Sequence, residues 1–352
     1  MRYFLGKFLI YLDCSVLRGV GLVRMFRIGV DVSFWMDKKY RMEFLKPCEK
    51  AGFDSVWFGD HFLPWHHSFK HSFYVWPVMA AAAERTRKIA IGVDVTVPIG
   101  GRYHPAIIAQ AIGTLDSMYP GRFYLGVGSG EAMSEKRFMG RWPSWKERIE
   151  RLAEAVELIR KLFTSEDFFD FNGKYFNMEK VYLYVKPKKK VPIYFSAGGP
   201  KAAVYAGRYG DHLITYGTVE KCRDEIFPAF EKGATEAGKD VRKMEKAVLI
   251  AGGLGNIDGA IKKIRTYHAG TLIPENFDEP DPRKIEESGQ KVTDEQILQN
   301  YYLFKKSDGL IDVIDKFRKI GTTHLIFTDF SVSPLRTIRI FAEEIIPYFK
   351  KH

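Results

Sequence analysis

A histidine and a tryptophan, His61 and Trp65, stand four residues apart just after the short apolar run 55–58. Imidazole changes charge near neutral pH, so His61 is a candidate general acid or base. Trp65 could lie over the protonated ring in a cation–π contact. A satisfied histidine that caps the end of a strand explains the same pattern equally well. Both interpretations stay open on these residues alone.

A metal cluster is a second interpretation of the same segment, because His66 and His67 lie close to His61 and His71. The spacings match no recognised set of metal ligands, and the sequence contains no HExxH motif. We therefore expect no metal site here.

Two glycine-rich segments could hold a ligand. Residues 126–131 end in Glu131, so a carboxylate follows directly on a loop whose backbone can approach a planar or anionic group. Residues 196–200 open into a helical pattern, and the free N–H groups of a helix start favour phosphate. Ordinary turn glycines are the alternative explanation for both segments.

The chain around these residues alternates short apolar runs with longer segments of helical period, which is typical of βα units around a parallel sheet. The eight expected strands are 26–32, 55–58, 89–95, 123–127, 192–196, 212–215, 246–250 and 323–328. Helical segments are expected at 38–51, 105–118, 145–163, 200–209, 220–237, 257–268 and 334–348. We predict an α/β fold, a (β/α)8 TIM barrel, whose active-site residues lie at the C-terminal strand ends.

Two insertions and one extension enlarge this barrel. Residues 170–190, with aromatic residues around Asn172-Gly173, predict a hairpin inserted before strand five. Residues 270–300 predict a lid-like excursion before strand eight. Residues 1–24 are expected to be an extension outside the barrel, with a membrane-surface anchor as the minority interpretation, and 25–352 to form one domain.

Composition limits the class of protein. The 352 residues are 46% hydrophobic, which suffices for one large core. The three cysteines are far apart, which argues against a disulfide framework and favours the cytoplasm. The net charge of +11 invites assignment to nucleic-acid binding, but only 186–190 is densely basic and it lacks interleaved aromatic residues. We expect no nucleic-acid partner and no membrane partner.

With these motifs assembled, the chain from residue 26 onward resembles the luciferase-like flavin and deazaflavin oxidoreductases, in the branch that uses coenzyme F420. The resemblance rests on three motifs, SVWFGDHFLPW at 55–65, YPGRFYLGVGSGEA at 119–132, and SAGGP at 196–200 followed by YAGRYGD at 205–211. It is strongest to F420-dependent glucose-6-phosphate dehydrogenases and related alcohol and sugar-phosphate dehydrogenases. Relatives of this kind commonly form homodimers.

The resemblance implies catalytic roles for three residues. His61 would take the proton of the substrate hydroxyl, Trp65 would stabilise the charged intermediate, and Glu131 would manage the proton at the far edge of the coenzyme ring. Hydride transfer from a carbinol carbon to the deazaflavin C5 would then make the enzyme a dehydrogenase acting on CH–OH donors.

The resemblance also implies which residues bind F420. Asp60 would contact the deazaflavin, and a bulge with a non-prolyl cis peptide would fall at Asp94-Val95. Val97 stands where the relatives have a small polar residue. The other implied contacts are Ser129, Gly130 and Ser134 at the ring, Ser196 at the helix start, and Gly198, Gly199, Lys201 and Ala202 at the phosphate.

One departure concerns the substrate. The relatives that oxidise glucose 6-phosphate bring three basic residues to the sugar phosphate, and the corresponding positions here read Val219, Asn276 and Asn300, with Lys221 or Arg283 as possible substitutes. Losing charge-assisted contacts to a dianion is costly. An uncharged alcohol or another sugar derivative is therefore the expected small-molecule substrate.

Three other functions stay open. The first is an FMN-dependent luciferase-like monooxygenase on the same barrel, and the second is an enzyme like the F420-dependent methylenetetrahydromethanopterin reductases. The third is a basic binding protein that uses the barrel as a scaffold. The combination of Asp60, His61, Trp65 and Glu131 favours the dehydrogenase.

Overall fold

A computed structural model of the chain describes residues 26–35 and 42–351. The predicted extension 1–24 and the first residues of the predicted helix 38–51 lie outside these ranges. Within them, no helix is long and apolar enough to cross a membrane.

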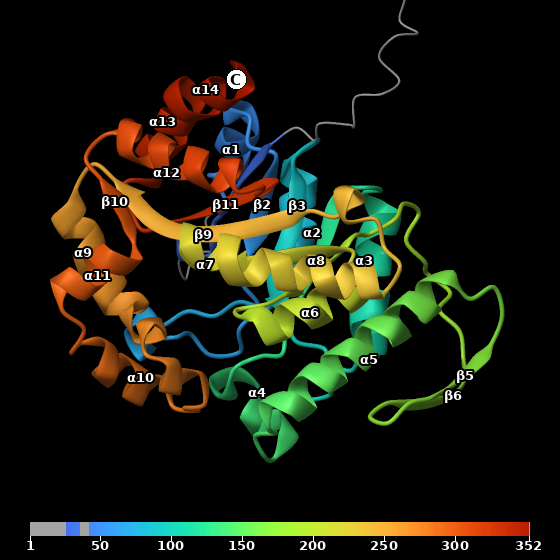
Figure 1. Cartoon of the computed structure of the whole chain (residues 1–352). Coiled ribbons are helices and arrows are strands. Elements are labelled where there is room, and N and C mark those ends of the chain that lie inside the picture. Colours follow the sequence, from blue (N-terminus) through green and yellow to red (C-terminus); the bar gives the residue numbers. More distant parts are fainter. Residues whose placement is uncertain (1–25, 36–41, 352) are drawn as a thin grey trace, which may run out of the picture.

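Eight parallel strands close into the predicted barrel (Figure 1). Neighbouring strands follow the order β11-β1-β2-β3-β4-β7-β8-β9, and β9 pairs again with β11 to close the ring. Strands such as β2 and β11 are buried along their whole length, as expected for strands covered on both faces. The barrel strands are β1 Arg27–Asp31, β2 Ser55–Phe58, β3 Ala90–Thr96, β4 Phe123–Val127, β7 Ile193–Ser196, β8 His212–Tyr216, β9 Lys246–Leu254 and β11 His324–Asp329.

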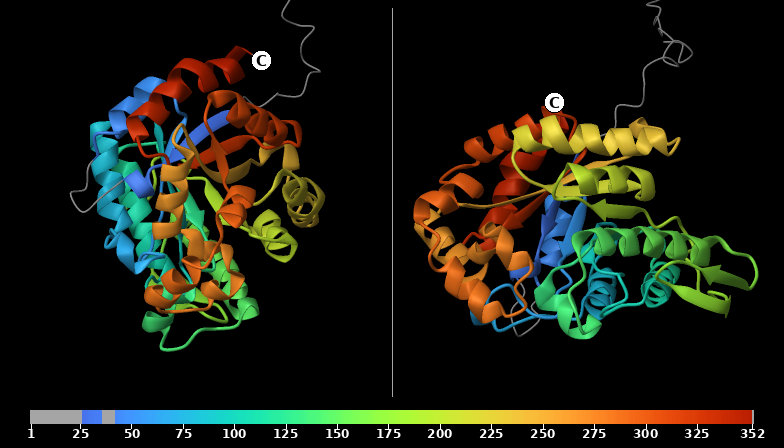
Figure 2. Two further views of the ribbon diagram at one scale, coloured as in Figure 1. Left: turned by 90° about the vertical axis from the view of Figure 1, so that its left-hand side faces the viewer. Right: turned by 60° about the horizontal axis from the view of Figure 1, so that its bottom comes forward.

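Helices surround the barrel on its outside (Figure 2). The helices are α1 Leu45–Ala51, α2 Val75–Arg85, α3 Pro105–Met118, α4 Ala132–Met139, α5 Trp145–Thr164, α6 Pro200–Tyr209, α7 Val219–Lys221, α8 Phe227–Glu236, α9 Ile257–Tyr267, α12 Ser307–Lys319, α13 Pro334–Ile340 and α14 Ile346–Lys351. Single π-helical turns join α7 to α8 and α13 to α14. Within the predicted helix 38–51, the observed helix α1 begins at Leu45. Pro47 therefore lies in the first turn, where its missing N–H group is tolerated.

The barrel interior is filled below the strand ends. Trp57, Tyr194, Ile214, Ala247 and Ile326 form a buried cluster inside the ring. A Cβ atom on Gly92 of β3 would lie 2.2 Å from the Trp57 ring, so only glycine leaves room for that side chain. Open space is therefore left at the C-terminal strand ends.

Two segments depart from the simple barrel, on opposite sides of it (Figure 1). Strands β5 Phe169–Asn172 and β6 Asn177–Val181 pair antiparallel as a hairpin between α5 and β7. Between α9 and β11 lie the 3₁₀ turns Ala269–Leu272 and Pro274–Phe277, helices α10 Pro282–Gly289 and α11 Asp294–Asn300, and strand β10 Tyr302–Phe304. Strand β10 was not predicted. The strand β9 continues beyond its expected end at residue 250, and β10 pairs with its residues 252–254.

Candidate active site

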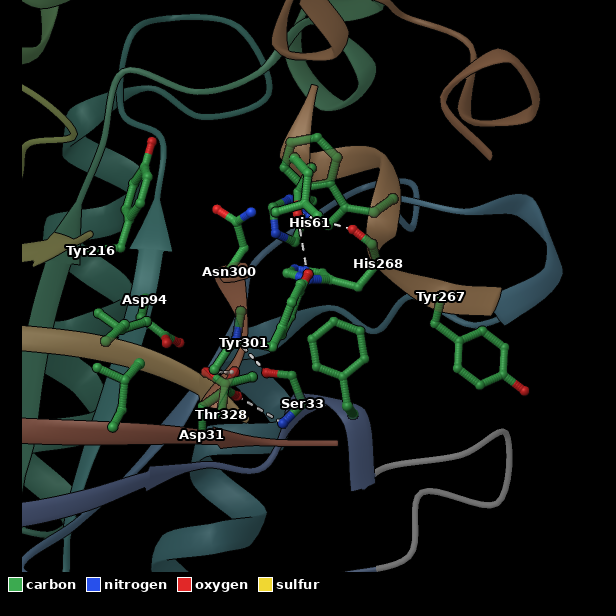
Figure 3. Close-up of a pocket in the computed structure, with 18 of the residues that line it drawn as sticks. Asp31, Ser33, His61, Asp94, Tyr216, Tyr267, His268, Asn300, Tyr301 and Thr328 are labelled. Atoms are coloured by element: carbon green, nitrogen blue, oxygen red, sulfur yellow. Dashed lines mark hydrogen bonds between the residues drawn. The ribbon is translucent and has the colours of Figure 1, made fainter. Parts of the chain in front are cut away.

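A cavity of about 790 Å³ opens at the C-terminal ends of the strands (Figure 3). Residues at or near the C-terminal ends of β1, β2, β3, β4, β7, β8 and β11 line it, together with residues 249–251 in the middle of β9. The segment between α9 and β10 supplies a further wall. This is the end of a barrel at which catalytic residues are found.

The three residues expected to be catalytic meet in this cavity. His61, Trp65 and Glu131 all line it. The Nδ1 atom of His61 lies 3.8 Å from Oε2 of Glu131, within ion-pair distance but too far for a hydrogen bond. The rings of His61 and Trp65 have centroids 5.7 Å apart and planes inclined at 66°. An aromatic edge, an imidazole and a carboxyl group thus face one space.

Burial separates the proton affinities of His61 and Glu131. Burial, together with the Arg102 guanidinium, lowers the pKa of His61 to about 4, so the imidazole is neutral at pH 7. Burial and the neighbouring Glu135 raise the pKa of Glu131 to about 7. A neutral base therefore lies beside a carboxyl group that holds a proton over part of the neutral range, which is the division of roles that acid–base catalysis needs.

Asp60 lies behind this pair and does not line the cavity. It is 1% exposed, and the Nη2 atom of Arg102 lies 3.1 Å from its Oδ2 atom and donates to its backbone oxygen at 2.7 Å. Tyr103 donates its hydroxyl proton to the other carboxylate oxygen at 3.3 Å. The backbone N–H of Arg102 is held in turn by Glu135. The buried Asp60–Arg102–Glu135 network thus supports the loop that carries His61.

The residues that the resemblance assigned to the deazaflavin ring divide into two groups. Asp94 and Val95 line the cavity, and the peptide bond between them is cis, as predicted. In contrast, Val97, Ser129, Gly130 and Ser134 do not line it. The Ser134 hydroxyl instead accepts a hydrogen bond from the backbone N–H of Phe62 at 3.1 Å.

The expected phosphate site lies at the start of α6. Ser196 lines the cavity, and Gly199 precedes the helix without a capping side chain. The N–H groups of Lys201 and Ala202, in the first turn, therefore have no partner within the helix. A Cβ atom on Gly198 would lie 2.6 Å from the Tyr216 hydroxyl, whereas one on Gly199 would meet no atom within 4 Å.

Polar groups that the sequence did not single out also reach the cavity. Asp31 accepts hydrogen bonds from the backbone N–H of Ser33 and from Thr328, and these residues gather at one wall with Asp94 near them (Figure 3). Among the residues that the structure describes, Asp94 Oδ1 has no hydrogen-bond partner. His268 lies with Nδ1 2.6 Å from the Tyr301 hydroxyl, and burial lowers the pKa of His268 to about 3.

Few cations approach the cavity. Lys221 is the one lysine or arginine that lines it in the described ranges. Asn276 is 7% exposed, and its amide donates to Gly270 and Ser288. Arg283 is exposed, bonds to Asp281 and does not line the cavity. Of the two suggested substitutes for the missing basic residues, only Lys221 is in place.

The histidines that suggested a metal cluster have other partners. Both ring nitrogens of His66 lie within hydrogen-bond distance of backbone groups, and His67 contacts Lys70. Across residues 26–35 and 42–351, no three histidine, cysteine or acidic side chains form a group that could hold a metal ion.

Comparisons with known proteins agree with this geometry. Residues 20–302 match the family model described as luciferase-like monooxygenase. The F420-dependent glucose-6-phosphate dehydrogenase of Segniliparus rotundus is 35% identical over 311 residues, which cover 87% of this chain and 92% of that protein. A solved F420-dependent secondary alcohol dehydrogenase, in complex with an F420–acetone adduct, is 40% identical with a TM-score of 0.86, covering 92% of this chain and 99% of that one. The F420-dependent tetrahydromethanopterin reductase of Methanopyrus kandleri, 20% identical with a TM-score of 0.71 over 92% of this chain and 99% of that one, shares the fold.

Proposed function

The chain belongs to the luciferase-like monooxygenase family, and from that membership we propose that it is a dehydrogenase which uses coenzyme F420 to oxidise the CH–OH group of an alcohol. The observation that carries the proposal is the neutral His61 beside Glu131 in a cavity that is lined by Ser196, four residues before the uncapped start of α6. Relatives that depend on F420, one of them a secondary alcohol dehydrogenase, support it.

The residues present suit a ligand with a planar ring and a phosphate. The cavity has room for a ring system, and the unpartnered Oδ1 of Asp94 offers it a polar contact. The uncapped start of α6 suits an anion. We assign the ring to Asp94, Val95, Glu131 and Ser196, and the phosphate to Gly198, Gly199, Lys201 and Ala202. Asp60 and Ser134 do not line the cavity, and their role is to hold the loop that carries His61.

The bound deazaflavin supplies a carbon, C5, that accepts a hydride and confines the chemistry to two-electron transfer. The protein supplies the proton steps. His61, neutral at pH 7, takes the hydroxyl proton as the carbinol C–H bond breaks. Trp65 packs against the imidazole of His61, which becomes positively charged when it takes this proton. Glu131 holds a proton below about pH 7 and would supply it to the bound coenzyme.

The chemistry of the cavity favours an uncharged substrate. A phosphate dianion needs several charge-assisted contacts, and Lys221 is the one cationic side chain lining the cavity in the described part of the chain. Aromatic side chains such as Trp65, Phe69 and Phe277 also line the cavity, which suits an alcohol with apolar flanks.

The substrate assignment is tested by following F420 reduction with two alcohols. Propan-2-ol is the chosen neutral probe because acetone, its oxidation product, is the ligand in the solved relative's adduct. We expect kcat/KM for propan-2-ol to exceed that for glucose 6-phosphate by at least about 100-fold, the cost of two missing charge-assisted contacts. Preference for glucose 6-phosphate would overturn the substrate class, and turnover with FMN in place of F420 would overturn the coenzyme.

The phosphate assignment is tested by Gly199→Ala. The added Cβ meets no protein atom within 4 Å, so it disturbs the protein little but occupies space above the start of α6. We expect the Kd for F420 to rise at least about tenfold, because a charge-assisted contact of about 1.5–3 kcal/mol is weakened. The matched control is the deazaflavin riboside without its phosphate, which should bind both proteins equally. Equal loss of affinity for both ligands would place the phosphate elsewhere.

The homodimer and the cytoplasmic location expected from the sequence stay predictions.

A further inference from the structure

His66 follows the catalytic loop directly and has no part in the proton steps. It is 0% exposed, with Nδ1 3.0 Å from the backbone oxygen of Thr266 and Nε2 2.9 Å from the backbone nitrogen of Gly270. A carbonyl oxygen only accepts, so Nδ1 must carry the proton, and a backbone N–H only donates, so Nε2 must accept. The two bonds together fix one neutral tautomer, and both are made to the end of α9 and the turn that follows it.

The space around the ring is fitted to an imidazole. A Cβ atom on Gly270 or on Gly289 would come within 2.8 Å of the His66 ring. These two glycines belong to the turn Ala269–Leu272 and to α10, so the ring packs against both parts of the segment. Because the pocket around the ring is closed and both its nitrogens have partners, His66 is not available as a metal ligand.

The contacts of His66 join two walls of the cavity, the loop after β2 and the segment after α9, and we call the place where they meet the junction. The loop after β2 provides His61 and Trp65, and the segment after α9 provides Thr271, Leu272 and Phe277. Trp65 and Phe277 meet edge to face across this junction, with ring centroids 5.2 Å apart.

A second contact crosses the same junction, where Ser68 donates from its backbone nitrogen and its hydroxyl to Glu286. That contact is exposed to solvent, where such bonds add little. The buried junction is the one made by His66.

We propose that His66 is a positioning residue, which fixes the wall formed by Trp65 and Phe277 relative to His61 and thereby sets which alcohols fit beside the base. The inference rests on the proposed function for its substrate. If His66 has this role, loosening the wall changes the affinity for alcohols and the selection between small and large alcohols. The coenzyme, held by residues outside this wall, binds as before.

The kinetic test compares three variants of the full chain with F420, using propan-2-ol and the bulkier cyclohexanol as probes. For His66→Ala we expect KM for propan-2-ol to rise at least tenfold, the ratio of kcat/KM between the two alcohols to change at least fivefold, and the Kd for F420 to stay within twofold. His66→Gln, whose side-chain oxygen can replace Nε2 as acceptor for Gly270, should recover most of the loss. His67→Ala is the matched control, because that neighbouring ring is exposed, and it should behave as wild type.

Hydrogen exchange in the protein without ligands keeps this test separate from the proposed function. In His66→Ala, amides of residues 266–273 and 282–291 should exchange faster, with the barrel strands unchanged. Unchanged exchange there, wild-type KM and selectivity, or equal behaviour of the Gln and Ala variants would overturn the positioning role. Faster exchange throughout the barrel with weaker F420 binding would also overturn it, in favour of a general structural role. Failure of the wild type to oxidise any alcohol would instead contradict the proposed function.

Discussion

Replacing His61 with alanine is expected to lower kcat for propan-2-ol oxidation by about 10²–10⁴-fold, the usual contribution of a positioned base. The residue lines the cavity, and burial keeps its imidazole neutral at pH 7, so the wild-type base is available without prior deprotonation. Coenzyme affinity should change little, because the groups assigned to F420 lie on β3 and β7, at the N-cap of α4, and at or just before the start of α6. Stopped-flow F420 reduction and an equilibrium F420 titration measure the two quantities.

Added imidazole provides the control for this variant. A free base that enters the space left by His61 should restore part of the turnover in His61→Ala and have no such effect on the wild type. Near-normal turnover in the variant would remove His61 from the role of base. A large loss of F420 affinity would mean that the side chain acts through the coenzyme site instead.

Replacing Glu131 with glutamine is expected to lower turnover about 100-fold and to remove one limb of the pH profile. Burial and Glu135 raise the pKa of Glu131 to about 7. The carboxyl group therefore carries a proton below pH 7 and loses it above, so wild-type alcohol oxidation should decline as pH rises through 7. The Gln side chain does not titrate, so this decline should vanish. The measurement is kcat against pH.

Glu135→Gln is the informative companion variant. Glu135 does not line the cavity, but its negative charge is one cause of the raised pKa of Glu131. Removing that charge lowers the pKa of Glu131, so the decline in kcat should move to lower pH and persist. If Glu131→Gln keeps the wild-type decline, another group carries the proton at that edge of the ring.

The strand ends explain why much of the site was predictable. Barrel strands buried on both faces leave continuous apolar runs, and the polar residues that follow them must gather at one end of the barrel. His61 after β2, Glu131 after β4 and Ser196 at the end of β7 were found in this way, and all three line the cavity. Asp31 at the end of β1 carries the same signal and was missed.

Other parts of the site have no such signal. His268, Tyr301 and Phe277 come from the segment between α9 and β10, whose path over the cavity is set by packing and not by strand periodicity. Asp60 stands beside His61 in sequence but faces away from the cavity, because Arg102, from the loop after β3, draws its carboxylate inward. That ion pair joins residues 42 positions apart, and no local pattern predicts it.

The net charge of +11 does not extend to the described lining of the cavity. Lys188, Lys189 and Lys190, from the densely basic segment, are exposed in the loop before β7. Among the described residues, Lys221 is the one lysine or arginine that lines the cavity. A basic chain can therefore enclose a cavity whose described lining holds few cationic side chains.

Hydride transfer from the carbinol carbon of an alcohol can be followed directly with a deuterium label. The purified protein is mixed with F420 and propan-2-ol deuterated at its central carbon, and the products are examined by mass spectrometry. We expect acetone together with reduced F420 that carries one deuterium, formed more slowly than with the unlabelled alcohol. Reduced F420 without deuterium, or F420 left unreduced, would contradict it.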